Sequence, residues 1–154
     1  MEREPEAAGD LLLDDQLCFP LYACAREAVS AYTPHLRELG LTYTQYVAMM
    51  VMWEEGRVPM RRLRERLFLD SGTLTPVLRK LEEKGLVTRE RSAEDARDLV
   101  VTITDAGRDL KARAASVPGQ VAPCYGDFGR FAELKELLGE LMVEFAQRRR
   151  ERGK

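Results

Sequence analysis

Apolar residues recur at helical spacing in the middle of the chain. Leu74, Val77, Leu78 and Leu81 fall at positions i, i+3, i+4 and i+7, which predicts a helix with one apolar stripe. Residues 70 and 71 can cap its start, and the proline at 76 is tolerable only in a first turn. The helix is therefore predicted to begin at about residue 72 or 73 and to end at Gly85, a residue suited to a left-handed backbone.

Two short β-branched runs, 86–91 and 99–104, follow this helix and predict a pair of strands. The tip between them is polar and carries Arg97. A small helix followed by a hairpin with an arginine at its tip is a winged-helix arrangement, in which the helix enters a major groove and the arginine reaches the neighbouring minor groove. Spacing alone leaves open a helix and hairpin of any small α+β domain with solvated charges.

Helical patterns also precede this segment. A first helix is predicted over about Leu17–Tyr32, which residues 34–39 extend or kink before the glycine at 40. Thr42–Gln45 has the spacing of a capping box, so a second helix should run from there to about residue 55. Pro59 at a first helical position opens a short third helix over Met60–Leu67, which carries four arginines.

After the hairpin, Thr104 is predicted to cap a helix that runs to about residue 117, where Pro118-Gly119 stops it. Gly119–Gly129 is predicted to be a loop. A last helix should carry apolar residues at helical spacing and end in a basic run. Its apolar residues are Phe131, Leu134, Leu137, Leu138, Leu141 and Phe145.

Composition and charge agree with a single domain that has a basic lobe. The 154 residues are 45% hydrophobic and 32% charged, with a net charge of −2. Segment 57–98 holds 11 Lys and Arg against 8 Asp and Glu, a net charge of +3, so the remainder carries −5. A local excess of positive charge is what contact with phosphate requires, whatever the sign of the whole chain.

These patterns predict a mainly α fold with a small β-hairpin wing, a winged helix-turn-helix. Residues 1–9 should be disordered, and residues 10–154 should form one domain. The DNA-binding lobe would cover about 42–104, flanked by dimerisation helices at about 10–40 and 105–148. Two long apolar helices at the ends of a small lobe favour a homodimer on a pseudo-palindromic double-stranded operator. The alternative is that the C-terminal stripe packs within its own chain.

We expect direct contact with DNA from polar side chains of the central helix and from the wing. The expected groove contacts are Ser71, Thr73, Thr75 and Arg79 with Arg97, and the expected phosphate contacts are Arg61, Arg62 and Lys80. Asp95 would orient Arg97 rather than contact DNA.

Other classes of function have less support. No uncharged run is long enough to cross a bilayer, and the acidic start has no signal-peptide h-region, so a cytoplasmic protein with no membrane partner is expected. Its thiols should then be free. His35 is the single histidine, and no metal-ligand spacing occurs, so neither a metal nor a cofactor is expected.

Several stretches together resemble the MarR family, and within it the organic hydroperoxide resistance regulators. The resemblance covers nearly all of residues 10–146. It rests on Leu17-Cys18-Phe19, Tyr22-Ala23, Tyr43-Thr44-Gln45-Tyr46, Leu69-Asp70-Ser71-Gly72-Thr73-Leu74-Thr75-Pro76 and Arg91-Ser92-Ala93-Glu94-Asp95-Ala96-Arg97.

This resemblance implies a homodimeric repressor that leaves DNA when an organic hydroperoxide oxidises its sensing cysteine. By position, Cys18 matches that cysteine, and Tyr32 and Tyr43 match tyrosines that hold its sulfur across the dimer interface. Tyr22 is a further candidate for that supporting role. Cys124 matches the resolving cysteine of the two-cysteine type, which forms an intersubunit disulfide.

Chemistry on its own supports these roles less sharply. Attack on a peroxide needs a thiolate, which phenol donors and a helix start both stabilise. A lone cysteine among apolar residues, like Cys18, is more often an inert core residue. Cys124 has a better case, because a Pro-Cys-Tyr-Gly loop is accessible, whereas Cys24 is assigned to packing. Pro20 departs from expectation, because a helix that began only there would leave Cys18 outside it.

Three alternative functions remain at this point. One is a MarR-type repressor released by a non-covalent aromatic ligand in the cleft between dimerisation and DNA-binding parts, with Cys18 incidental. A thiol peroxidase using Cys18 and Cys124 would turn over many equivalents of hydroperoxide, but no His/Asp partner or Cys-X-X-Cys pair supports an enzyme. The third is a purely structural helical dimer, which the wing argues against.

Overall fold

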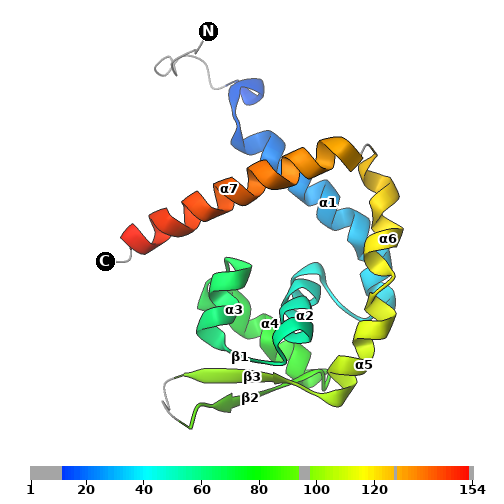
Figure 1. Cartoon of the computed structure of the whole chain (residues 1–154), viewed down its shortest axis with the longest axis vertical. Helices are drawn as coiled ribbons and strands as arrows, with labels where there is room; N and C mark the ends of the chain where they lie inside the picture. Colours follow the sequence, from blue (N-terminus) through cyan, green and yellow to red (C-terminus); the bar gives the residue numbers. More distant parts are fainter. Residues whose placement is uncertain (1–11, 94–97, 127, 153–154) are drawn as a thin grey trace.

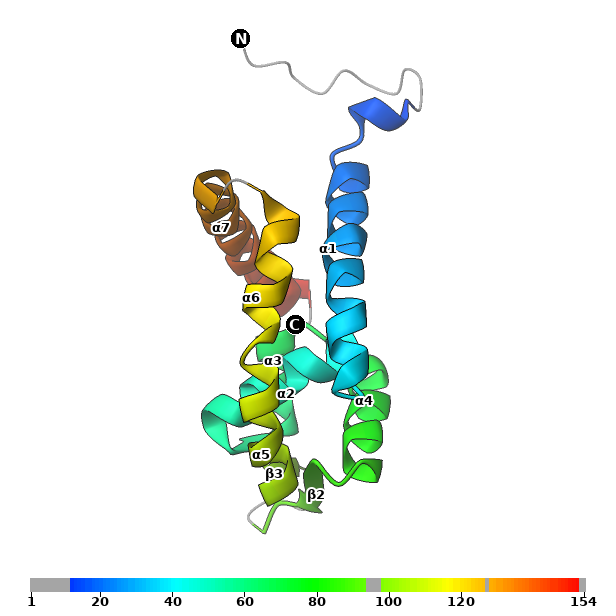
Figure 2. The same ribbon diagram turned by 90° about the vertical axis from the view of Figure 1, so that its right-hand side faces the viewer.

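The computed structural model describes residues 12–93, 98–126 and 128–152. This part of the chain is mainly helical with a small antiparallel sheet, which confirms the predicted fold class. The winged lobe lies at one end, and two long helices, α1 (Cys18–Glu38) and α7 (Phe128–Arg152), lie at the other end (Figures 1 and 2). Two predictions, the disorder of residues 1–9 and the place of Arg97 at the wing tip, lie outside the described residues.

The lobe has the helices and strands of a winged helix-turn-helix. Its elements are α2 (Tyr43–Glu55), β1 (Arg57–Pro59), α3 (Met60–Leu67), α4 (Ser71–Glu83), β2 (Val87–Arg91) and β3 (Leu99–Ile103). The strands pair in the order β1-β3-β2, all antiparallel. The two predicted strands are confirmed to within one residue at each end.

Strand β1 was not predicted, and the placement of Pro59 at a first helical position is wrong. Pro59 ends β1 and is the N-cap of α3, with an extended backbone. Within the described sheet β1 lies at an edge, where proline is tolerated because its missing amide donor faces no partner strand.

The segment after α5 (Asp105–Ala114) also differs from expectation. Pro118 and Gly119 do not stop the helical path, because they lie within α6 (Val117–Val121), and Pro118 takes one of the first two positions, where no amide donor is needed. The predicted loop over Gly119–Gly129 is likewise wrong. A 3-10 helix η2 (Ala122–Tyr125) follows α6, and α6 lies beside α1 (Figure 2).

Caps and buried stripes explain why the lobe folds as predicted. The capping box of α2 is present, with the Gln45 amide 3.3 Å from Thr42 Oγ1 and the Thr42 amide 3.2 Å from Gln45 Oε1. Leu74, Leu78 and Leu81 are fully buried against the rest of the core. The core therefore fixes α4 by its apolar stripe and leaves its opposite face in solvent.

The first helix starts earlier and runs further than its prolines suggest. A short 3-10 helix η1 (Leu13–Asp15) precedes α1, which begins at Cys18 with Pro20 in its first turn and continues through Pro34. Cys18 is thus inside the helix start rather than before it. Within the described residues, no helix is both long and apolar enough to cross a membrane.

Candidate functional site

Helix α4 presents a polar face that its N-terminal cap holds in place. The Asp70 carboxylate accepts a hydrogen bond from the Thr73 amide at 2.8 Å. This bond, with one from the Thr73 hydroxyl, lowers the pKa of Asp70. The expected groove-contacting residues of this helix are all exposed: Ser71, Thr73, Thr75 and Arg79. Arg97 and Asp95 lie outside the described residues.

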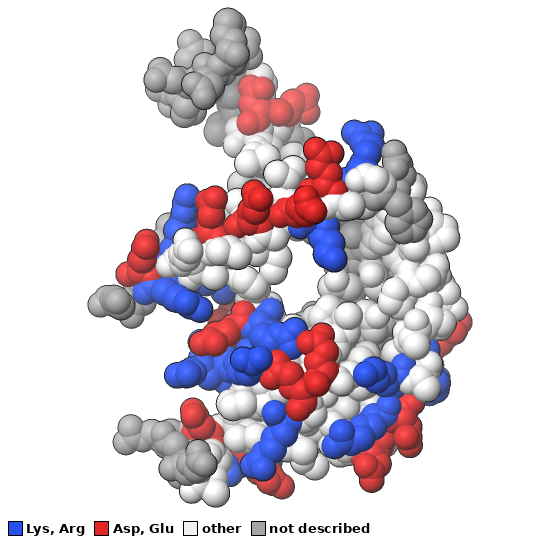
Figure 3. Space-filling model, viewed as in Figure 1, with Lys and Arg blue, Asp and Glu red and all other residues white. Residues whose placement is uncertain are grey.

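The expected phosphate contacts are exposed, and each has an acidic neighbour. Arg62 Nε lies 2.6 Å from Glu55 Oε2, and this bond is the largest cause of the lowered pKa of Glu55. Arg61 and Lys80 make looser pairs, at 3.9 Å to Glu65 and 3.8 Å to Glu83. Exposed pairs of this kind contribute little and rearrange readily, so these cations can still face phosphate. Figure 3 shows basic side chains gathered over the α3 region, interleaved with acidic ones, and acidic side chains along α7.

Two contacts that sequence reasoning missed fasten α4 to its neighbours. Arg89 of β2 binds Glu82 through its backbone amide at 3.0 Å and its guanidinium at 2.7 Å, which joins the wing to the end of α4. Lys84 Nζ donates to Gln45 Oε1 at 2.7 Å and also to the Gly40 carbonyl, which joins α4 to the start of α2. For the first contact the sequence signal was only the opposite charge of Glu82 and Arg89 on either side of the Gly85 turn.

Tyrosines gather where α1 meets α2. The Tyr32 and Tyr43 rings lie edge to face, 5.1 Å apart, so the structure brings these two predicted residues together. Tyr46 joins them 5.9 Å from Tyr32, and burial is the main cause that raises the pKa of both Tyr43 and Tyr46. Tyr22 is not in this cluster, since it lies earlier on α1 and is 63% exposed.

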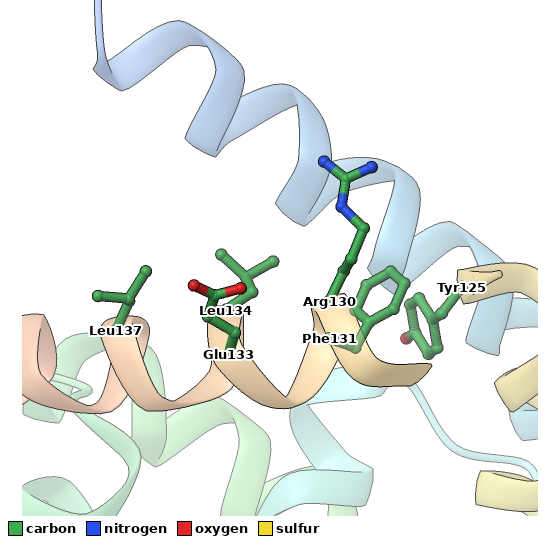
Figure 4. A pocket seen from close by; sticks show the side chains of 6 residues that line it. All are labelled: Tyr125, Arg130, Phe131, Glu133, Leu134 and Leu137. Atoms are coloured by element: carbon green, nitrogen blue, oxygen red, sulfur yellow. The ribbon is translucent and has the colours of Figure 1, made fainter. Parts of the chain in front are cut away.

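Tyr125, which sequence reasoning also missed, lies in η2 and packs against the edge of the core. Its ring lies 5.1 Å from that of Phe131 (Figure 4). Burial is the main cause that raises the pKa of Tyr125 to about 12. The signal that could have found it is its place next to Cys124.

All three cysteines are free and exposed in the chain. Cys18 is the first residue of α1. Cys124 lies in η2. The assignment of Cys24 to packing is wrong for the single chain, because the helix face that carries it is not covered by the chain's own core.

Helices α1 and α7 hold large apolar residues in solvent. On α1 they begin just before the helix with Leu17, 74% exposed, and include Phe19. On α7 the exposed apolar residues are Leu134, Leu137, Leu138, Met142, Val143 and Phe145. Apolar surface on this scale marks a protein-protein interface.

Two cavities border α7. One of about 460 Å³ is lined by Tyr125, Phe131 and Arg130 with α7 residues 133, 134 and 137 (Figure 4). The other, of about 750 Å³, separates α7 from the lobe, where Figure 3 shows the molecule hollowed. Its lining combines Tyr43, apolar side chains and arginines: Val47, Leu67, Phe68, Met142, Phe145, Arg66, Arg148 and Arg149.

Known proteins share this arrangement over most of its length. The family model described as Transcriptional regulator SarA/Rot matches residues 30–114. The organic hydroperoxide resistance transcriptional regulator of Bacillus subtilis (strain 168) is 42% identical over 84% of this chain and 86% of its own length. The regulator SarZ of Staphylococcus saprophyticus is 43% identical over 73% of this chain and 77% of its own.

Solved structures agree with these relatives. Reduced AbfR bound to DNA superposes with a TM-score of 0.74 and 34% identity, over 88% of this chain and 93% of that one. The disulfide form of AbfR gives a TM-score of 0.60 and 35% identity, over 84% and 92%. The fold and these relatives together define a winged-helix transcriptional regulator. The chain belongs to the SarA/Rot family of regulators and, among MarR-type proteins, to the organic hydroperoxide resistance branch.

Proposed function

We propose that the protein is a homodimeric repressor that binds operator DNA and leaves it when an organic hydroperoxide oxidises Cys18. The observation that carries this proposal is an exposed cysteine at the start of a helix whose first apolar residues, Leu17, Phe19 and Leu21, are exposed in the described part of the chain. Tyr32 lies 14 residues along the same helix, roughly 21 Å away at 1.5 Å per residue. Tyr32, and Tyr43 packed against it, can therefore serve Cys18 only from a second subunit.

The chemistry takes two steps. The Cys18 thiolate sulfur attacks the O–O bond, so the hydroperoxide is reduced to an alcohol and the sulfur becomes a sulfenic acid. The Cys124 thiol of the partner then attacks that sulfur, a disulfide forms and water leaves. Formation of this disulfide would move η2 and the dimerising helices. Because the DNA-binding lobes are attached to these helices, the separation of the two α4 helices would change. Half-sites about 34 Å apart tolerate little change in that separation.

The test is fluorescence anisotropy of the reduced protein on DNA from just upstream of its gene, titrated with cumene hydroperoxide and then with dithiothreitol. We expect release near one equivalent per subunit, reversed by the thiol. Cys18→Ser should bind and ignore peroxide, whereas Cys24→Ser, an exposed cysteine of the same helix, should behave as the parent protein. Cys124→Ser protein with unchanged, disulfide-dependent release would exclude the resolving role.

A second candidate function has support from the cavity of about 750 Å³. Tyr43, the apolar lining and three arginines suit an aromatic carboxylate, which would release DNA without oxidation. Phenolic carboxylates that release both the parent protein and Cys18→Ser would favour this function. Consumption of many peroxide equivalents per subunit with a reductant would instead indicate a thiol peroxidase.

A further inference from the structure

We propose that Glu55 is a built-in competitor of DNA, which limits the affinity of the protein by binding Arg62 and Arg66 where a phosphate would otherwise bind them. This inference deepens the proposed function and rests on its DNA-binding part alone. It requires neither Cys18 nor a disulfide.

Glu55 holds two arginines of the neighbouring helix at once. Its Oε2 accepts a hydrogen bond from Arg62 Nε at 2.6 Å, and its Oε1 accepts one from Arg66 Nη1 at 2.8 Å. Glu54 adds a second carboxylate, 2.7 Å from Arg66 Nη1. The two arginines are four residues apart, so they lie on one face of α3, next to the end of α2. In the DNA-free protein, carboxylates therefore bind two of the four arginines of α3.

Both arginines remain accessible to a phosphate. The side chains of Arg62 and Arg66 are 58% and 35% exposed, whereas that of Glu55 is 21% exposed. Exposed ion pairs contribute little to stability, and a guanidinium binds phosphate through the same N–H groups that bind a carboxylate. In a helix-turn-helix the first helix, here α3, crosses the DNA backbone while the second enters the major groove. A phosphate that reaches α3 can thus replace Glu55, but it must first break the two hydrogen bonds.

The position of Glu55 in the chain favours this exchange. Glu54 and Glu55 are the last two residues of α2, where the negative end of the helix dipole disfavours an anion. They also reduce the charge that DNA meets. Segment 57–98 carries a net charge of +3, which falls to +1 when the segment is extended to residue 54. The affinity is therefore lower than the arginines alone would give, and a modest change in the position of the lobes suffices for release.

The substitution Glu55→Gln removes the charge and keeps the size of the side chain. Binding of the reduced full-length protein to operator DNA and to a scrambled duplex is measured by fluorescence anisotropy at several salt concentrations. We expect Glu55→Gln to bind both duplexes about 2- to 10-fold more tightly, with a log–log salt slope steeper by about 0.9 for each newly neutralised phosphate. A similar gain on both duplexes is expected because phosphate contacts carry no sequence information.

Glu65→Gln is the matched control, because it removes the same charge from α3 itself. Glu65 lies 3.9 Å from Arg61, a looser pair, so this substitution should change binding much less than Glu55→Gln does. A second comparison uses Arg62→Ala. It should weaken binding more in the Glu55→Gln background than in the parent protein, because only in that background is the guanidinium released from its carboxylate.

Equal gains in Glu65→Gln and Glu55→Gln would show that overall charge alone acts, and would overturn the inference. Glu55→Gln protein that binds no more tightly would overturn it too. So would a variant that binds more weakly and unfolds at a lower urea concentration, since the pairs would then support α3 rather than compete with phosphate. Each of these results leaves the proposed repressor intact, whereas a parent protein that binds no DNA would refute the proposed function and this inference together.

Discussion

Arg149 Nη1 lies 3.2 Å from the carbonyl oxygen of Phe68, so the C-terminal helix donates a hydrogen bond to the turn between α3 and α4. Phe68 has a φ of +55°, which places a bulky residue in the left-handed region. The bond thus ties α7, which carries exposed apolar residues, to the strained turn from which α4 starts. It is a direct path by which movement of α7 would reach α4, the helix that is expected to contact DNA.

We predict that Arg149→Ala weakens operator binding by the reduced protein about 2- to 5-fold, because the turn before α4 is held less firmly. The salt dependence of binding should not change, since this guanidinium binds protein rather than phosphate. Fluorescence anisotropy at several salt concentrations measures both quantities. Arg150→Ala removes the same charge from the next position and is the control. An equal loss in the two variants would show that charge alone matters.

The exposed face of α4 predicts a different pattern for its own cations. Lys80→Ala should lower the log–log salt slope of binding by about 0.9, the value for one neutralised phosphate. Arg79→Ala should weaken binding to the specific operator by roughly 5- to 150-fold and blunt discrimination against altered operators. Arg26→Ala, in the N-terminal half of α1, should leave both quantities as they are. Binding that does not respond to Arg79→Ala would remove α4 from the interface.

The cap of α4 predicts how acid affects stability. The pKa of Asp70 is lowered in the folded state, chiefly by the hydrogen bond from the Thr73 amide. Its stabilisation is therefore present above the unfolded pKa of about 3.9 and is lost as pH falls through the folded pKa. Asp70→Asn keeps a capping oxygen, so its urea midpoint should match the parent at pH 7 and fall less between pH 4 and pH 2.

Asp109→Asn serves as a control for that experiment, because Asp109 is an exposed residue in the middle of α5. It should reproduce the acid dependence of the parent protein. A parallel acid loss in Asp70→Asn and in the parent would mean that other carboxylates, such as Glu82 beside Arg89, dominate the transition.

Exposed apolar residues on α7 predict the oligomeric state. Leu137 is 58% exposed, and a lysine there would put a charge into any interface formed by this face. Leu137→Lys should shift the protein from dimer toward monomer in sedimentation equilibrium and reduce operator affinity with it. Glu136→Lys changes charge by a larger amount at the adjacent position and is the control. A parent protein that sediments as a monomer would refute the dimer.

Local signals were enough to place most of the lobe. Thr42 and Gln45 make the capping box that their spacing indicated, and Gly85 has the left-handed backbone expected of a helix end. The family resemblance indicated that Tyr32 and Tyr43 lie close together, and their rings are 5.1 Å apart. The spacing of apolar residues does not show what packs against them. Cys24 was assigned to packing, although its side chain is exposed in the chain. Tyr125 was missed because Pro118 and Gly119 suggested a loop where two short helical segments turn the chain inward.

Gly107 gives the sharpest test of how the lobe packs. A Cβ there would lie 2.2 Å from the Leu86 carbonyl oxygen and 2.8 Å from Ile103 Cγ1, and backbone cannot yield cheaply. The Gly107 carbonyl also accepts a hydrogen bond from Trp53 Nε1 at 2.7 Å, which holds the position. Gly107→Ala should therefore lower the free energy of unfolding by about 1–3 kcal/mol.

Gly119→Ala is the matched substitution, because a Cβ at Gly119 meets no heavy atom within 4 Å in the described part of the chain. It lies in α6 and should raise the free energy of unfolding by about 0.4–1 kcal/mol, since alanine restricts the unfolded chain more than glycine does. Urea unfolding followed by Trp53 fluorescence measures both variants. If Gly107→Ala were as stable as Gly119→Ala, the start of α5 would not pack against the Leu86 backbone, and the placement of the wing against α5 would be wrong.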